Sequence, residues 1–487
     1  MLIEAQTSWG SNRRVTSAVD PPKHTLDPER SDSYALDSSG DDMTIQRSFA
    51  FNTPADGDAW EPRLPSELKL LVEFKPVHVA RSTFKAGVAA SVHRWFRLTP
   101  SFGPDLVRLM LDKLNCSSSD VVLDPFAGAS TTLIECKLNG IRSFGFEINP
   151  FLHFVGRVST DWSIESEILR EELSKIQDRF ASSPLVSNID DLQDIGLAVP
   201  PIHNPHRWWR SDVLIDLLRL KRCIRSSADD RVRDFFLLAF AGALVPDLTN
   251  VTLGRLQLHF VDKSNASMDV MSTFVAHASG MIDDLADISS MDDVAVSKIY
   301  LQDSLNLSEL KDAPRASAVI TSPPYPNRYS YVWNTRPHLY MLDFFDTAKQ
   351  ASALDRKTIG GTWGTATSEL AKGCVEPRST NVAGALKHII KPLRDADVLM
   401  SNYVVHYFNR LEQQIIEMDR ALCPTADLAY VVGNSEIKGI YVDTDVILAS
   451  LIEGCGLGFR VTDVSRFRRR NSGRDLFETI VFARRRG

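Results

Sequence analysis

Short apolar runs and amphipathic stretches alternate along most of the chain beyond about residue 66. The clearest example is the segment DVVLDPFAGASTTLIECKLNGIRSFGFEINP, residues 120–150, which begins with an apolar run at 121–123. A turn of small residues follows, then a helix-forming stretch at 131–138 that an Asn-Gly pair ends, and a second apolar run at 144–146. The pattern predicts strand, turn, helix and strand, which implies parallel strands joined by a right-handed crossover.

The same alternation continues on both sides of this segment. The further predicted elements are a helix starting near Pro104, helices at 211–226 and 231–245, strands within 297–307 and 316–325, a helix at 403–422, a strand at 427–435, a helix at 444–453 and two strands within 459–470 and 475–486. The last two strands are expected to form an antiparallel hairpin. Alternating helices and strands predict the α/β class, with a doubly wound, Rossmann-like sheet and a helical insertion.

Four stretches of the chain differ in character. Residues 1–65 are rich in Ser, Asp, Pro and Arg and show no sustained periodicity, which predicts a disordered N-terminal tail. Residues 66–155 and 297–487 carry the sheet patterns, so we expect them to form the two parts of one α/β domain. Residues 156–296, between them, are the predicted helical insertion.

Composition places the chain among ordinary globular proteins, since 44% of its 487 residues are apolar. The most continuous apolar stretch, residues 234–248, is too short and too interrupted to cross a bilayer, and the N-terminus lacks a charged-then-apolar signal pattern. We therefore expect a cytoplasmic protein without a membrane partner. The six cysteines lie far apart, without CxxC pairs or nearby histidines, so neither disulfides nor a metal site is expected.

Charge is unevenly distributed. A net charge of −7 argues mildly against a nucleic-acid partner, because phosphate contacts favour Lys and Arg. Cations nevertheless gather near the C-terminus, at residues 466–470 and 484–486. The stretch HRWWRS, residues 206–211, mixes basic and aromatic side chains and is suited to contacting phosphates and stacked bases. The alternative for this stretch is the packed start of a helix.

The turn after the first strand of the 120–150 segment has the parts of a nucleotide-like binding site. Small residues there let the backbone approach a ligand, and Glu147, 19 residues after Gly128 and at the end of the second strand, can accept hydrogen bonds from ribose hydroxyls. The glycine signal is weak by itself, because Ala129 and Ser130 occupy positions where a dinucleotide fold favours glycine. Ser130 is the expected N-cap of the following helix. An ordinary strand-to-helix turn remains the alternative.

The segment TSPPY at the end of the 316–325 run is the second candidate site. Pro324 restricts Pro323 to an extended conformation, so the Ser322 hydroxyl and the Pro323 carbonyl form a rigid pair of acceptors. Tyr325 adds a flat face that can stack on a planar ring. Two acceptors beside a stacking face suit an exocyclic amino group of a base, which has two N–H donors. A tight proline turn that caps a buried strand is the alternative.

Together, DPFAGASTT at 124–132 and TSPPY at 321–325 resemble the motifs of the amino-methyltransferases, which methylate exocyclic nitrogens of DNA bases with S-adenosylmethionine. The serine form of the second motif is most typical of the cytosine-N4 branch. The resemblance extends to HRWFRLTPSFGPDLV, FGFEINP, LQDS and VVGNSEIKGIYVDTDVIL, and covers about residues 90–155 and 297–485. It implies the class I methyltransferase fold. Ser130 departs from the family pattern, which has a second loop glycine there.

The resemblance also implies which residues form the site. Phe102 is expected near the methionine part of the cofactor, Glu147 at the ribose and Asp303 near the adenine. The full set expected to bind S-adenosylmethionine is Phe102, Asp124, Pro125, Phe126, Ala127, Gly128, Ser130, Thr131, Glu147, Asn149 and Asp303. The expected catalytic residues are Ser322, Pro323, Pro324 and Tyr325.

The implied reaction is direct methyl transfer to the amino group of a base that has been flipped out of double-stranded DNA. It needs no metal and no cysteine nucleophile. Cytosine N4 is the leading target, with adenine N6 and guanine N2 of RNA as enzymatic alternatives and a catalytically silent nucleic-acid-binding protein as the non-enzymatic one. A cognate restriction endonuclease or a defence-system protein is a candidate partner.

The target-recognition region is left open between two segments. The helical insertion falls before the strand that leads to Asp303, not directly before the TSPPY loop, and this order argues against it. The second candidate is the Gly/Thr-rich segment 355–381, which follows the TSPPY loop and the next helix.

Overall fold

The computed structural model describes residues 61–77, 87, 89–254, 257–289, 294–308, 310, 314–361, 365–470 and 475–485. The chain divides into two units, Met1–Ala55 and Asp56–Gly487, and the described residues all belong to the second. Of the predicted tail, residues 1–65, residues 1–60 lie outside the described part of the chain. Arg63, however, is part of the folded unit, because its Nε donates to the buried carboxylate of Glu453 at 3.1 Å.

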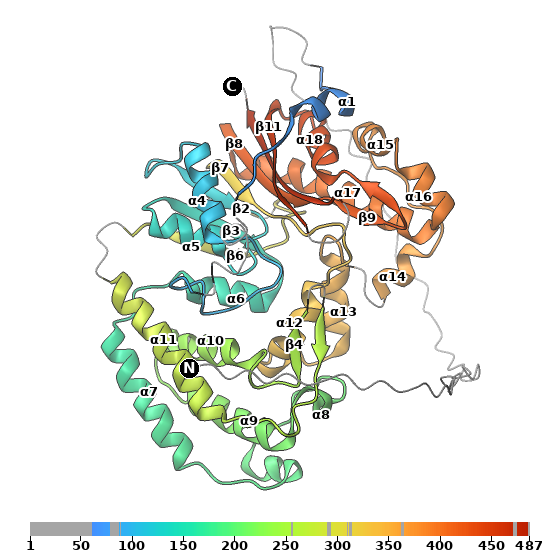
Figure 1. The fold of residues 1–487 in the computed structure, drawn as a ribbon. Helices are drawn as coiled ribbons and strands as arrows, with labels where there is room; N and C mark the ends of the chain where they lie inside the picture. The colour runs from blue at the N-terminus through green and yellow to red at the C-terminus, as the bar shows by residue number, and fades with distance from the viewer. Residues whose placement is uncertain are drawn as a thin grey trace, which may run out of the picture. The chain divides into compact units, whose positions relative to one another are not determined.

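An eight-stranded sheet forms the centre of this unit, in the order β1-β11-β12-β8-β7-β2-β3-β6 (Figure 1). The strands are β1 (Val72–Phe74), β2 (Val121–Asp124), β3 (Arg142–Glu147), β6 (Ser297–Leu301), β7 (Ala316–Thr321), β8 (Leu422–Gly433), β11 (Phe459–Arg469) and β12 (Phe477–Arg485). Neighbouring strands run parallel except at β12, which is antiparallel to both β8 and β11. The sheet is of the doubly wound, Rossmann-like α/β type, and the predicted antiparallel hairpin is β11–β12.

Helices and small elements fill the connections between the strands. The helices are α1 (Pro65–Leu68), α4 (Pro104–Lys113), α5 (Thr131–Leu138), α6 (Pro150–Ser159), α7 (Ser166–Ala181), α8 (Pro205–Trp208), α9 (Ser211–Arg225), α10 (Asp230–Leu244), α11 (Val270–Ile288), α12 (Tyr331–Met341), α13 (Ala348–Lys357), α14 (Thr365–Leu370), α15 (Thr380–Leu386), α16 (Ile390–Ala396), α17 (Val398–Met418) and α18 (Thr444–Gly454). Two short hairpins add β4 (Val251–Leu253) with β5 (Leu258–Phe260), and β9 (Ser435–Ile437) with β10 (Ile440–Val442). No described helix has the length and apolar character needed to span a membrane.

The two faces of the sheet pack against different helices, because successive side chains of a strand point to opposite faces. Val122 packs with α4 and α5 on one face, whereas Leu123 packs with α17 and α18 on the other. In β7 the same alternation places Ile320 on the α4 side and Val319 on the α17 side. The period-two pattern of the sequence thus becomes a three-layer α/β arrangement.

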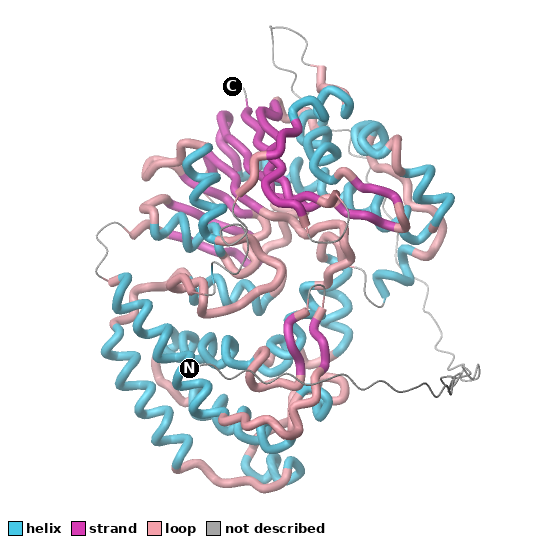
Figure 2. The backbone as a smooth tube through the Cα atoms, in the orientation of Figure 1, coloured by secondary structure: helices cyan, strands magenta, loops and turns pink. Residues whose placement is uncertain are grey.

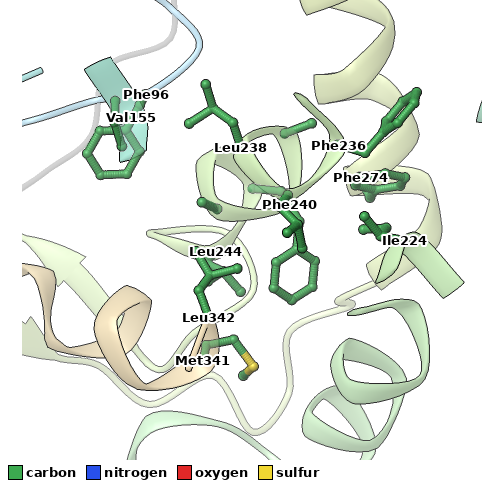
Figure 3. Close-up of a cluster of buried hydrophobic side chains, with 14 of the residues drawn as sticks. Phe96, Val155, Ile224, Phe236, Leu238, Phe240, Leu244, Phe274, Met341 and Leu342 are labelled. Carbon is green, nitrogen blue, oxygen red and sulfur yellow. The ribbon is translucent and has the colours of Figure 1, made fainter. Parts of the chain in front are cut away.

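The predicted helical insertion lies between β3 and β6, and its strands among the described residues are only the short β4 and β5 (Figure 2). Helix α10 runs through its core: Leu244 lies beside Leu342 and Met341 of the α12 end, and Phe96 lies beside Val155 (Figure 3). These side chains belong to one buried cluster that also includes α6. The helical region is therefore packed against α5, α6 and α12 of the sheet domain.

Two basic clusters of the sequence prove to be packed or paired. In HRWWRS, Trp208 and Trp209 are buried, and Trp208 contacts Phe260 edge-on. The cations of the last hairpin meet carboxylates: Arg466 donates to Asp445, Arg468 pairs with Glu478, and Arg484 and Arg485 pair with Asp427 and Asp419. The described C-terminal cations therefore serve the fold, and the packed-helix alternative describes the two tryptophans.

Candidate functional site

The site lies where the order of the sheet reverses. From β2 the chain proceeds to β3 and β6 on one side, and from β7 to β8 on the other, while β2 and β7 are direct neighbours. The loops that follow β2 and β7 therefore leave the same edge of the sheet side by side, at the switch point where open α/β sheets bind ligands. One cavity is lined by both loops.

The cavity brings together most of the predicted site residues. Those that line it are Phe102, Pro125, Phe126, Ala127, Gly128, Thr131, Glu147, Asn149, Asp303, Ser322 and Pro324. They come from the loops after β2, β3, β6 and β7 and from the segment before α4. Four predicted residues do not line it: Asp124, Ser130, Pro323 and Tyr325.

Glu147 at the end of β3 organises the loop that follows β2. Its Oε2 accepts from the backbone N–H of Gly128 at 2.8 Å, and its Oε1 accepts from the N–H of Asn149 at 2.8 Å. Burial raises the pKa of this carboxyl to about 7. The two backbone hydrogen bonds favour the charged form and so oppose this rise in pKa. Each oxygen keeps a further lone pair, so Glu147 can hold its own loop and still accept from a ligand in the cavity.

Gly128 allows the loop to approach the cavity closely. It has a left-handed φ of +52°, and a Cβ at this position would lie 3.3 Å from Leu98. A side chain here would therefore be strained by its backbone conformation and would crowd the cavity wall.

Asp124 supports the loop from below. The carboxylate is buried, and its Oδ1 accepts from the Thr321 hydroxyl at 2.6 Å and from the Phe126 N–H at 3.0 Å. Burial raises the pKa of Asp124 to about 6. Because Thr321 directly precedes the TSPPY serine, this carboxylate joins the ends of β2 and β7.

Ser130 does not act as predicted. It occupies the N-cap position of α5, but it has a left-handed φ of +65° and its side chain accepts no hydrogen bond from the helix. The hydroxyl is buried without a partner among the described residues and faces Gly156 of α6, where a Cβ would lie 2.3 Å from it. The expected capping role is wrong, because the left-handed backbone turns the side chain away from the free N–H groups of α5.

The TSPPY loop is anchored by its carbonyl groups. The Pro324 carbonyl accepts from the Tyr407 hydroxyl at 2.7 Å, and the Tyr325 carbonyl accepts from the Asn327 N–H at 2.8 Å. The Tyr325 ring lies against Gly433 of β8, where an added Cβ would be 2.7 Å from two ring carbons. Burial raises the pKa of the Tyr325 phenol, while a hydrogen bond with Ser322 opposes that rise.

Asp303 lies in the loop after β6 and faces the same cavity. Its Oδ1 accepts from the Leu305 N–H at 3.0 Å, which turns the loop at the end of the strand. Phe126, Phe146 and Leu305 add apolar surface to the wall of the cavity.

Several residues of the cavity wall were missed from the sequence, and four of them come after the TSPPY loop. Tyr331 begins α12, and Lys357, Thr358 and Ile359 follow at the end of α13. Tyr331 and Glu147 line the same cavity, and burial together with the charge of Glu147 raises the pKa of the Tyr331 phenol. The three residues at 357–359 belong to the Gly/Thr-rich segment 355–381, so that segment was the one sequence signal that pointed to them.

These groups fit a nucleoside-like cofactor. A carboxylate with free lone pairs stands at the end of the second parallel strand, a glycine turn crosses the end of the first, and aromatic and aliphatic side chains line the space between them. This donor and acceptor set suits a ribose and a purine ring.

Comparisons with known proteins agree with this assignment. A family model described as DNA methylase, for N6 and N4 methyltransferases, matches residues 74–154. The Type II methyltransferase M.MvaI of Kocuria varians is 22% identical over 68% of this chain and 73% of its own length. The Type II methyltransferase M.BsoBI of Geobacillus stearothermophilus is 22% identical over 55% of this chain and 57% of its own length.

Among solved structures, an rRNA methyltransferase, aviRa from Streptomyces viridochromogenes, aligns with 82% of this chain and 92% of its own, at 9% identity and a TM-score of 0.30. A similarity at that level carries no weight for fold or substrate. The strand order, the loops at the switch point, the matching family model and the two Type II relatives carry the conclusion. In these features the chain is similar to the DNA amino-methyltransferases, which take their methyl group from S-adenosylmethionine.

Proposed function

We propose that this protein methylates the exocyclic N4 amino group of cytosine in a flipped-out base of double-stranded DNA. The observation that carries the proposal is that Ser322 and Pro324 of the TSPPY loop line the same cavity as Glu147, Gly128 and Asp303. An amine held by the loop after β7 would thus face a cofactor held by the loops after β2, β3 and β6. The serine at position 322 favours cytosine N4 over adenine N6.

The loop has the acceptors that such an amine needs. The Ser322 hydroxyl and the Pro323 carbonyl accept from the two N–H donors of the amine, which directs the nitrogen lone pair away from the ring plane. Among the described residues no donor contacts the Pro323 carbonyl, while the neighbouring Pro324 carbonyl is occupied by Tyr407. As positive charge develops on the nitrogen, both acceptors stabilise it. Tyr325, whose ring packs against Gly433 and does not line the cavity in this structure, would stack on the base once the base is bound.

The cofactor side of the cavity would be held by the remaining predicted residues. Glu147 accepts from the ribose hydroxyls, Asp303 lies near the adenine and Phe102 near the methionine part. When bound, S-adenosylmethionine supplies an activated methyl group whose transfer removes the positive charge of its sulfonium. The protein contributes chiefly alignment of the amine with that group and exclusion of water.

Target recognition is proposed for the segment 355–381. Lys357 and Thr358 reach the cavity wall, whereas Trp208 and Trp209 of the helical region are buried. Because the two relatives are Type II methyltransferases, we further propose a restriction endonuclease of the same sequence specificity as the partner activity.

The test is to express the protein in a host without DNA methylation and to map modified bases by single-molecule sequencing. We expect N4-methylcytosine at one short sequence, and its loss in Ser322→Ala. N6-methyladenine at the site would replace the cytosine assignment with the adenine one. Unmodified DNA together with N2-methylguanine in RNA would overturn the proposal.

A further inference from the structure

Helix α17 carries a row of polar side chains that faces the site from outside the cavity. The row is Tyr403, Tyr407, Arg410, Gln413 and Glu417. Spacings of four, three, three and four residues place all five on one face of the helix. Each of them makes a hydrogen bond to the backbone of a loop that borders the cavity.

Two tyrosines hold the TSPPY loop. The Tyr407 hydroxyl donates to the Pro324 carbonyl at 2.7 Å, and the Tyr403 hydroxyl accepts from the Arg328 N–H at 3.1 Å. Arg328 has a left-handed φ of +61°, which an L side chain rarely adopts without support. Both ends of the loop are therefore fixed by side chains one helical turn apart.

Arg410, the next residue of the row, holds the segment that follows α13. Its guanidinium donates to the carbonyls of Arg356 and Lys357, at 2.8 and 2.5 Å. Burial lowers the pKa of Arg410, while the charge of Asp303 opposes the fall. The same cation therefore orients Lys357 at the cavity wall and faces the loop after β6.

The last two residues of the row hold the loop after β6. Gln413 Nε2 donates to the Leu305 carbonyl at 3.0 Å, and Glu417 Oε2 accepts from the Leu307 N–H at 3.2 Å. This loop contains Asp303, so one helix face connects the proposed cofactor side of the cavity with the proposed catalytic side.

We infer that this face of α17 is the positioning frame of the active site and that Tyr407 is its principal positioning residue. The Pro-Pro pair has no backbone N–H groups, so the loop can be held there only through its carbonyls. By fixing the Pro324 carbonyl, Tyr407 sets the peptide plane that leads into Tyr325 and leaves the adjacent Pro323 carbonyl to the substrate amine. The inference rests on the proposed function, because it assigns Tyr407 to the transfer step.

Tyr407→Phe tests this inference, since it removes one hydroxyl and keeps the ring. The expected result is a fall in kcat of about tenfold or more, because a misplacement of about 1 Å at a reacting group can cost roughly a hundredfold. The KM for S-adenosylmethionine stays within about twofold, because the cofactor loops after β2 and β3 are not touched. Tyr403→Phe removes the hydrogen bond to Arg328, and it should also lower kcat, by a smaller factor, without changing the KM for S-adenosylmethionine. This variant replaces Tyr407→Phe if Tyr407→Phe does not fold.

Tyr430→Phe is the matched control. Tyr430 is as fully buried as Tyr407, and its hydroxyl donates to Gln414 of α17 at 3.0 Å; among the described residues it makes no hydrogen bond to a loop of the cavity. Both variants should lose similar thermal stability, and only Tyr407→Phe should lose kcat.

The outcomes separate the two proposals. Wild-type activity on DNA with equal kcat values in Tyr407→Phe and Tyr430→Phe would overturn the positioning inference and leave the proposed function standing. A wild-type protein that binds S-adenosylmethionine but transfers no methyl group to DNA would overturn the proposed function, and the inference with it.

Discussion

Two helical regions adjoin the cavity, and they are built in opposite ways. The region 156–296 lies behind the cofactor side, and its contact with that side is buried and paired: Asp284 of α11 accepts from the Val92 N–H, from the Trp95 indole at 2.8 Å and from the Arg94 guanidinium at 2.6 Å. The region 348–418 lies behind the catalytic side. It reaches the cavity wall with Lys357, an exposed cation that forms no ion pair among the described residues.

The difference shows that composition is a poor guide to a nucleic-acid surface. HRWWRS has the aromatic and basic side chains that bind nucleic acid, yet both tryptophans are buried and the Arg207 guanidinium lies 3.9 Å from the centre of the Phe260 ring. The Gly/Thr-rich segment 355–381 has few such residues but borders the cavity. Location at the cavity, and charge left unpaired there, are the better evidence for a DNA contact.

The largest expected effect comes from breaking the buried contact of the first region. Asp284→Ala leaves the Trp95 and Val92 N–H groups without an acceptor, and we expect a loss of about 3 kcal/mol in the free energy of unfolding. Affinity for S-adenosylmethionine should fall too, because the same segment leads to Phe102. Urea denaturation and calorimetry measure the two effects.

Asp283→Ala is the control for that variant. Asp283 is the preceding residue of α11, but its carboxylate is exposed and pairs with the exposed Arg170 at 3.4 Å. A loss as large in Asp283→Ala as in Asp284→Ala would mean that the buried contact is not what joins the region to the cofactor side.

Charge removal in the second region should weaken DNA binding without weakening the fold. Arg328 is also exposed, and both it and the segment after Lys357 lie against the Tyr403 hydroxyl. For Arg328→Gln with Lys357→Gln we expect DNA affinity to fall by about 2 kcal/mol. The slope of log affinity against log salt should decrease by about 2, since each phosphate contact contributes roughly 0.9.

Arg207→Gln tests in the same assay whether the region 156–296 contributes to DNA affinity. It removes an exposed cation of HRWWRS, and the salt slope should not change. Equal slopes for Arg207→Gln and Lys357→Gln would show that both regions touch DNA, and the contrast between them would fail.

Local patterns predicted those parts of the site whose geometry is local. The 120–150 segment contains β2, α5 and β3 in full, so its apolar runs and turn residues were enough to place Gly128 and Glu147 at the end of the sheet. The TSPPY loop was placed by the same reasoning. Both predictions depend on interactions within about 30 residues.

The rest of the site depends on contacts between distant segments. Tyr407 meets Pro324 across 83 positions, and nothing in either stretch indicates the other. The acids that pair with the C-terminal arginines come from other elements, for example Asp445 of α18 for Arg466. The sequence showed the cations but not their partners, and for that reason they looked available for phosphate.

The smallest expected effect is the pH dependence of ligand affinity, which should differ between S-adenosylmethionine on one side of the cavity and DNA on the other. The pKa of Glu147 is raised to about 7, so its carboxyl takes up a proton between pH 8 and pH 6. Since the protonated form holds the ribose less well, the Kd for S-adenosylmethionine should rise by about tenfold over this range, following the ionised fraction. DNA affinity, which we assign to Arg328 and Lys357, should change less.

Glu147→Gln cannot ionise and controls for the titration of the cofactor itself. In this variant the Kd should be higher at pH 8 and nearly constant down to pH 6. The raised pKa also means that the folded state binds this proton more tightly than the unfolded state, so Glu147 makes folding less favourable as pH rises from about 4.5 to about 7. A wild-type Kd that is flat between pH 8 and pH 6 would mean that Glu147 does not hold the ribose in its ionised form, and the cofactor side would then need another acceptor.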